Sequence, residues 1–301
     1  MSESLATYPA DAAAAMSEPA SGPQPSATTS TEVTVIAPAT GWRLLPAREV
    51  WRYRELLYFF IWRDVKVQYK QTVLGAAWAV WNPVLNMVIF SILFGRLVPV
   101  PSDDAPYPIF VYAGLLPWTF FANSVTQSSL SLVNQTHLVT KIYFPRVLLP
   151  MAAVGTSLVN VIPALGVYAL MMAWYGHVPG PIVLLLPVFV LLAGLAGLGV
   201  GLIFSSATLT YRDMRHLVPS VVQAWMYLSP VIYAPSLVPD RYRWVMDLNP
   251  MAGVIGACRS SLLSKPMDWM ALGTSAGLTS ALLAVGLIAF HRTERRFADV
   301  A

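Results

Sequence analysis

The most constraining feature of this sequence is a series of long stretches without a charged side chain. No Asp, Glu, Lys or Arg occurs in residues 71–95, 105–140, 147–211, 216–239 or 269–291. A helix needs about 20 apolar residues to cross the hydrocarbon core of a bilayer, and each stretch reaches that length. Charged residues make up 11% of the chain, against roughly 25% in soluble domains. We therefore expect an all-α membrane protein.

The longest stretch, residues 147–211, has room for two crossings. Its midpoint, residues 174–181, combines interfacial aromatics with Gly and Pro, which is typical of a turn. Dividing the stretch there gives six expected transmembrane helices, at about residues 76–97, 107–130, 147–174, 181–208, 215–234 and 269–290. Gly197 and Gly201, and also Gly273 and Gly277, stand four apart in these helices, which favours close helix packing within the bundle.

The distribution of Lys and Arg predicts the orientation, because basic residues in short loops stay on the cytoplasmic side. With the N-terminus inside, the cytoplasmic segments hold 14 of the 19 basic residues, and the outer segments hold five. Both ends are therefore expected in the cytoplasm. The basic balance reflects this topology and contact with anionic lipid, so no nucleic-acid partner is expected.

The remaining segments have different compositions. Residues 1–42 are rich in Ala, Ser, Thr and Pro, which predicts a disordered tail. Residues 43–71 alternate aromatic and basic side chains, which predicts an amphipathic helix in the inner interface; a plain lipid anchor without another role fits equally well. A transmembrane domain is expected over residues 72–290, followed by a cytoplasmic tail at 291–301.

The outer segment between the fifth and sixth spans, residues 235–267, is unusually apolar. Its apolar run, residues 248–258, is too short to cross a bilayer. We therefore expect a re-entrant or interfacial hairpin on the periplasmic side, where it could act as a gate at a pore mouth.

Motifs for catalysis or metal binding are absent from the sequence. It has no G-x-x-x-x-G-K-[ST] phosphate loop, its four histidines lack metal-ligand spacing, and Cys258 is its one cysteine. We expect no catalytic residue, cofactor or metal on this chain, so any ATP-driven step needs a partner. The expected spans also lack ionisable residues away from their ends, which disfavours ion-gradient coupling and intramembrane catalysis.

Aromatic side chains are abundant in the expected spans. Flat rings are surfaces on which sugar rings can stack, so a channel lining is one interpretation. The residues assigned to this lining are Trp81, Phe90, Trp118, Phe121, Trp225, Tyr227 and Tyr233. The alternative is that these residues form ordinary belts at the membrane interface, as most membrane Trp and Tyr do.

Four short patches follow one another between residues 46 and 290. They read WRDVKVQYK at 62–70, YAGLLPW at 112–118, KIYFPR at 141–146, and RDM at 212–214 leading to LSPVIY at 228–233. A fifth patch, LNP at 248–250 with Arg259, lies in the outer hairpin. In these patches and their order, the chain resembles the permease subunit of ABC-2 type polysaccharide exporters, which export O-antigen, capsule, teichoic acid and related glycans.

The resemblance implies a complex in the inner membrane of a bacterium. Two copies of this chain would pair, and two copies of a cytoplasmic ATP-binding cassette subunit would hydrolyse Mg-ATP. Hydrolysis would drive a lipid-linked glycan outward between the permeases, among membrane lipids. An ABC-2 type drug or lipid exporter has the same architecture and stays open, as does a membrane-embedded glycosyl- or acyltransferase, against which the lack of intramembrane acids argues.

The same resemblance implies roles for particular residues. The loop 131–146 would hold the coupling helix that docks on the ATPase, through Lys141, Ile142, Tyr143, Phe144, Pro145 and Arg146. The alternative is that Lys141 and Arg146 only enforce topology and bind lipid phosphate. The substrate would enter beside Arg63, Asp64 and Tyr69. The periplasmic gate would contain Trp244, Asn249, Pro250 and Arg259.

Overall fold

The computed structural model of the chain describes residues 47–70, 77–97, 105–141 and 144–294. The contacts separate residues 1–42 from a second unit, residues 43–301, and only the second is described here. The expected disordered tail, Ile142, Tyr143 and most of the expected C-terminal tail lie outside the described residues.

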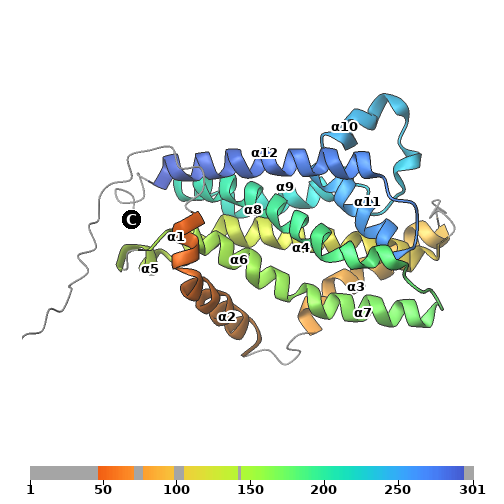
Figure 1. The fold of residues 1–301 in the computed structure, drawn as a ribbon, viewed down its shortest axis with the longest axis horizontal. Coiled ribbons are helices and arrows are strands. Elements are labelled where there is room, and N and C mark those ends of the chain that lie inside the picture. The colour runs from red at the N-terminus through yellow and green to blue at the C-terminus, as the bar shows by residue number, and fades with distance from the viewer. Residues whose placement is uncertain (1–46, 71–76, 98–104, 142–143, 295–301) are drawn as a thin grey trace, which may run out of the picture. The chain divides into compact units, whose positions relative to one another are not determined.

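The described part of the chain is helical and contains no strand, which confirms the predicted fold class (Figure 1). The first half contains α1 (Ala47–Arg52), α2 (Arg54–Lys70), α3 (Ala77–Ile92), η2 (Leu93–Leu97), α4 (Tyr107–Asn134), α5 (Thr136–Lys141), α6 (Leu148–Val159) and α7 (Val161–Trp174). The second half contains η3 (Pro181–Leu185), α8 (Leu186–Thr210), α9 (Met214–Leu228), η4 (Pro235–Leu237), η5 (Asp240–Tyr242), α10 (Arg243–Asp247), α11 (Pro250–Leu262) and α12 (Trp269–Glu294).

Four helical stretches are long and apolar enough to cross a bilayer. They are Tyr107–Asn134, Leu148–Trp174, Pro181–Thr210 and Trp269–Thr293. Helices α3 and α9 stand where the first and fifth spans are expected, and both are shorter. The chain is thus a multi-pass membrane protein, and the count of six crossings stays a prediction.

Proline explains two interruptions in these helices. Pro163 has no N–H to donate to the carbonyl of Val159, and α6 ends at that residue before α7 begins at Val161. Pro230 disfavours helical geometry at Ser229, which is extended with φ −98° and ψ 147°, so α9 ends at Leu228. The second interruption produces an irregular segment, residues 229–232. Its backbone carbonyls need hydrogen-bond donors from elsewhere in the bundle.

Helix α4 is the centre of the bundle and packs against α3, α6, α7, α8, α9 and α11. Its contact with α8 depends on glycine, because a Cβ added at Gly197 or Gly201 would lie 2.7 or 2.6 Å from the Cβ of Ser124 or Ser128. This confirms close packing at that pair. The expectation for Gly273 and Gly277 is wrong, because a Cβ added at either residue meets nothing within 4 Å.

Helix α12 instead approaches α8 at a different glycine. A Cβ added at Gly286 would lie 2.4 Å from the carbonyl oxygen of Gly199, so the two backbones cross there. Consequently, the glycines at 273 and 277 lie on the outward face of α12.

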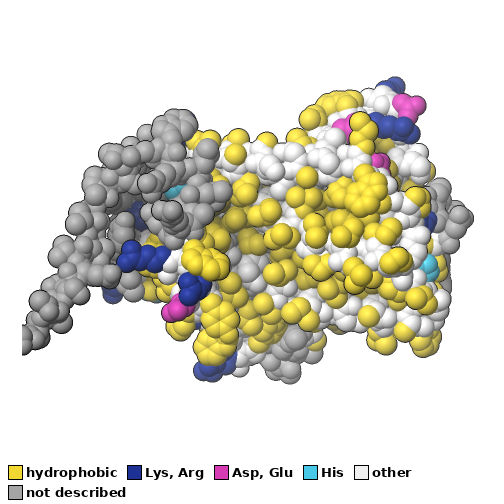
Figure 2. Space-filling model, viewed as in Figure 1, with side chains coloured by type: hydrophobic (Ala, Val, Ile, Leu, Met, Phe, Trp, Pro, Cys, Tyr) yellow, Lys and Arg dark blue, Asp and Glu magenta, His cyan; other side chains and the backbone are white. Residues whose placement is uncertain are grey.

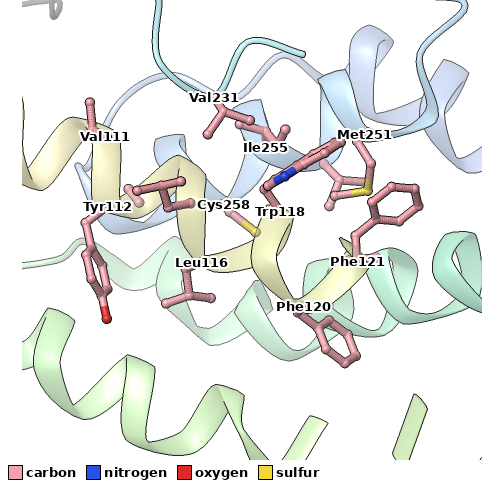
Figure 3. Packing of buried hydrophobic residues seen from close by; sticks show 14 of the residues in the cluster. Val111, Tyr112, Leu116, Trp118, Phe120, Phe121, Val231, Met251, Ile255 and Cys258 are labelled. Atoms are coloured by element: carbon pink, nitrogen blue, oxygen red, sulfur yellow. The ribbon is translucent and has the colours of Figure 1, made fainter. Parts of the chain in front are cut away.

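The apolar core has two parts. The larger part surrounds α4 and includes residues of α8, α9 and α11 (Figure 3). The smaller part joins α2 to α6, α8 and α12 through Phe60, Phe144, Leu148, Leu202 and Phe290. On the surface seen in Figure 2, apolar side chains cover the middle of the unit, while Lys and Arg gather toward its two ends.

Candidate functional site

A polar cavity of about 590 Å³ lies between α2, α3, α4 and α6. Twelve of the sixteen residues that line it are polar, and seven of these are Asn or Gln. Asp64 is the one lining residue with a formal charge among those that the structure describes. A second hollow of about 20 Å³ shares Pro83, Thr119, Asn123 and Asn160 with it and extends the space toward α7. The cavity thus has a polar and mostly neutral lining in an otherwise apolar domain.

Helix α4 contributes a polar stripe, Thr119, Asn123, Gln127 and Ser131, to this cavity. These residues stand four apart, which places them on one face of the helix. Between Tyr107 and Val133, the side chains of Asn123 and Gln127 are the only exposed ones. Neither amide hydrogen-bonds another protein group in the described residues. The two amides are therefore available to a molecule in the cavity.

Helix α2 closes one side of the cavity with an ion pair. Arg63 donates from Nη2 and Nε to Oδ1 of Asp64, at 2.7 and 2.9 Å, and Asp64 lines the cavity. Both side chains are a little over a quarter exposed. The guanidinium of Arg63 also lies 5.1 Å from the centroid of the Phe60 ring. The pairing neutralises the charge that Asp64 would otherwise bring to the lining.

Tyr69 connects the end of α2 to the break between α6 and α7. Its hydroxyl donates to Oδ1 of Asn160, another lining residue. Burial raises the pKa of Tyr69 above its usual range, so the phenol stays protonated and keeps its donor at neutral pH. The structure therefore brings Asp64 and Tyr69 to the cavity, with Arg63 beside them. Their role in substrate entrance stays a prediction.

The predicted coupling residues have different environments. Phe144 is only 5% exposed, and its ring packs edge-on against Phe60, with 5.5 Å between centroids. Lys141, at the end of α5, is exposed, and Pro145 and Arg146 are half-buried. Phe144 therefore packs in the chain's own core, whereas Lys141 faces outward. Docking of this loop on a partner stays a prediction.

The aromatics predicted to line a channel do not border this cavity. Trp118 and Phe121 are buried, with their ring centroids 5.3 Å apart, and Phe121 meets Trp225 edge-on at 5.3 Å. In Figure 3, Trp118 lies beside Met251 and Ile255 of α11. These contacts are helix packing inside one copy of the chain.

The other four aromatics have varied exposure. Phe90 is buried and Tyr233 half-buried, whereas Trp81 and Tyr227 are about half exposed, at 49% and 53%. Only the exposed pair has rings available to another molecule. A channel-lining role for Trp81 and Tyr227 stays a prediction.

Sequence reasoning missed the polar stripe of α4, although the four-residue spacing of Thr119, Asn123, Gln127 and Ser131 was readable. Neutral amides carry no charge and have no aromatic ring, so neither the charge pattern nor the aromatic pattern of the sequence marks them. Within the described residues, no group of His, Cys, Asp and Glu is arranged to hold a metal ion. The lining offers amides and hydroxyls, which bind neutral polar groups by hydrogen bonds.

Side chains of α4 and of the segment predicted as the outer hairpin hold the irregular segment 229–232 in place. Nδ2 of Asn249 donates to Oγ of Ser229 at 2.8 Å, and Nη2 of Arg259 donates to the carbonyls of Pro230 and Val231 at 3.1 and 2.9 Å. The hydroxyl of Tyr107 donates to the carbonyl of Ile232 at 2.7 Å. We call these three donors, Tyr107, Asn249 and Arg259, the outer clamp.

Arg259 is the central member of the outer clamp. It is only 5% exposed, and its guanidinium lies 3.7 Å from the centroid of the Phe110 ring. Gly114 makes room for it, because a Cβ there would lie 2.7 Å from Nη2 of Arg259 and 2.8 Å from the Val231 carbonyl oxygen. Asn249 also caps α11 by accepting from the Met251 N–H at 3.0 Å. Two predicted gate residues, Asn249 and Arg259, therefore hold residues 229–231 in place.

The other two predicted gate residues differ from the clamp. Pro250 is buried at the first position of α11, where its missing N–H leaves no helical bond unmade. Trp244 on α10 is exposed. Helices α10 and α11 lie at the end of the bundle opposite α1 and α5 (Figure 1). Gating by this segment stays a prediction.

A sequence profile described as ABC-2 type transporter matches residues 55–263, which run from α2 to α11. The chain belongs to the ABC-2 type transporter family. The matched region contains the residues of the polar cavity, helix α5 and the outer clamp. The predicted resemblance is thereby confirmed.

Curated relatives in this family align over most of their length. The chain is 28% identical to the O-antigen export system permease protein RfbA of Klebsiella pneumoniae, over 82% of this chain and 95% of the relative. It is 29% identical to a protein of the same name from Myxococcus xanthus, over 84% and 97%. It is 23% identical to the polysialic acid transport protein KpsM of Escherichia coli, over 77% and 90%.

Proposed function

We propose that this chain is the permease subunit of an ATP-driven transporter that exports a polysaccharide. The observation that carries the proposal is similarity, over at least 90% of their length, to proteins named for O-antigen export and polysialic acid transport. The polar cavity agrees with it, because a hydroxyl-rich substrate needs hydrogen-bonding groups inside an apolar domain. The chain is a transport component and not itself an enzyme.

ATP hydrolysis belongs, in this proposal, to a separate cytoplasmic subunit that carries Mg-ATP. The sequence contains no phosphate-binding loop, so the energy must come from a partner. The exposed Lys141 beside the α5 loop supports docking there, at the end of the bundle that also holds α1. This end would face the cytoplasm, with both chain termini, and the outer clamp would face the periplasm across the inner membrane.

A second copy of the chain completes the conduit in this proposal, with two ATPase copies. Helix α9 supports it, because only Val218, Val222 and Met226 are buried along its length. Its remaining faces, including Leu217 and Tyr227, are exposed and available to a partner helix. The substrate would be a glycan on a lipid carrier, whose tail remains in the bilayer.

Deleting the gene for this chain tests the proposal. Lipid-linked glycan should accumulate inside the cell and disappear from the surface, and the wild-type gene supplied in trans should restore it. Surface glycan would be measured by electrophoresis of extracted glycolipid. Normal surface glycan together with altered drug sensitivity would contradict the proposal and favour an ABC-2 drug exporter. Glycosyl or acyl transfer by the purified chain without ATP would favour a transferase.

A further inference from the structure

We infer that the polar cavity between α2, α3, α4 and α6 binds uncharged sugars of the substrate through their hydroxyl groups. The inference rests on the proposed function. It goes further by placing a binding site within one copy of the chain and by naming the class of sugar that this site binds. The cavity volume of about 590 Å³ lies within the roughly 300–1,000 Å³ of small-molecule sites. It therefore suits a short stretch of a glycan.

The lining matches sugar hydroxyls in hydrogen-bonding character. Each amide carries two N–H donors and one carbonyl acceptor, so it pairs with a hydroxyl acting in either sense. Asn82 on α3 lies opposite the α4 amides Asn123 and Gln127 across the cavity, and all three side chains are exposed to it. A sugar supplies several hydroxyl groups at once, and these can replace the water at the exposed amides.

The charge of the lining selects among sugars. No Lys or Arg lines the cavity among the described residues, and Asp64 is already paired with Arg63. A carboxylate or phosphate brought into this space would exchange water for neutral hydrogen-bonding groups and would gain no cation from the described lining. The cavity therefore favours neutral sugars over acidic sugars and over the phosphate of a lipid carrier.

A binding measurement on the full complex tests this inference. The permease, co-purified with its ATPase and placed in lipid nanodiscs, would be titrated with three probes. These are undecaprenyl diphosphate carrying a neutral hexose trisaccharide, the same lipid with one hexose replaced by glucuronic acid, and the lipid without sugar. We expect the neutral probe to bind at least about tenfold more tightly than either of the others.

Substitutions locate the binding. Asn82→Leu, Asn123→Leu and Gln127→Leu should each weaken binding of the neutral probe by about two- to tenfold, the range for losing one hydrogen bond. Asn86→Leu is the matched control, because Asn86 lies one turn from Asn82 on α3 and does not line the cavity. It should leave the Kd unchanged. A second measurement needs no substitution. A neutral probe with a diazirine on its sugar should crosslink to residues of α4 in the wild-type complex.

The outcomes separate this inference from the proposed function. Equal affinity for all three probes, or wild-type affinity in all three cavity variants, would overturn the sugar site while loss of surface glycan in the deletion strain still stood. Tighter binding of the acidic probe would overturn the neutral class. Unchanged surface glycan in the deletion strain would remove the proposed function, and this inference with it.

Discussion

At the scale of single residues, the outer clamp shows how a membrane domain satisfies an interrupted helix. Pro230 ends α9 and leaves the carbonyls of residues 230–232 without helical partners, which is costly away from water. Arg259 and Tyr107 donate to all three carbonyls. Arg259 therefore has a structural explanation, and no contact with substrate is needed to account for its burial.

Replacing Arg259 should destabilise the protein measurably. Arg259→Leu removes the donor to two buried carbonyls, and each unsatisfied group costs about 1–3 kcal/mol. We expect a lower midpoint of thermal unfolding in detergent and faster proteolysis of residues 235–247. Arg212→Leu is the control, because Arg212 is exposed, lies outside residues 235–247 and should change neither measurement. Wild-type unfolding of Arg259→Leu would contradict the role of the clamp.

Gly114 offers an independent approach to the same clamp. Gly114→Ala places a Cβ 2.7 Å from Nη2 of Arg259, so the guanidinium must move away from the carbonyls. Overpacking of this kind costs typically about 1–3 kcal/mol. Gly166→Ala is matched to it, because a Cβ at Gly166 meets nothing within 4 Å. We predict a lower unfolding midpoint for Gly114→Ala only; equal midpoints would show that the site relaxes without strain.

At the scale of elements, a chain of contacts joins the predicted coupling loop, residues 131–146, to the cavity. Phe144 packs on Phe60, Arg63 lies over the Phe60 ring, and Asp64, paired with Arg63, lines the cavity. If an ATPase docks on this loop, these contacts link the docking surface to α2 and the cavity. Helix α2 thus has a route to act as more than a lipid anchor.

Two substitutions in the loop should have separable effects. Lys141→Ala should reduce export and ATPase stimulation without changing stability, because Lys141 is exposed. Phe144→Ala should reduce both and also lower the free energy of unfolding by about 3 kcal/mol, since its ring is buried. Export, ATP hydrolysis and thermal unfolding would be measured on the same preparations. Full export by Lys141→Ala would contradict its part in docking.

The elements themselves were largely predictable from the sequence. Charge-free stretches located the four long spans, because a bilayer excludes unpaired charge and sets the length of a crossing. The aromatic and basic run of residues 43–71 likewise predicted a helical segment, and α1 and α2 lie within it. The division between α6 and α7 at Asn160 was harder to place, since proline in a membrane helix can bend it as well as end it.

The sites were less predictable than the elements. In the outer clamp, Arg259 bonds to Pro230 and Val231, which stand 29 and 28 positions before it in the sequence. Tyr107 bonds to Ile232, which is 125 positions away. Only the packed bundle reveals these pairs. The aromatics Trp118 and Phe121 pack in the core, because large rings fill space between helices as readily as they line a channel. The polar stripe on α4 was the readable signal.

At the scale of the whole molecule, the described unit separates its features along the bundle. Helix α5 lies at one end, the polar cavity borders α2 and the C-terminal half of α4, and α11 with the outer clamp lies at the opposite end (Figure 1). No phosphate loop accompanies them in the sequence. This arrangement suits one subunit of a conduit that a partner drives.

The central claim is that this chain carries a polysaccharide across the membrane with energy from a partner. Its most direct test is transport into sealed vesicles that contain the purified permease and its co-purified ATPase. Added lipid-linked glycan should become protected from an external glycosidase only when ATP and Mg²⁺ are present, and the Gln127→Leu variant should slow this protection. Protection without ATP, or none with the complete complex, would contradict the account.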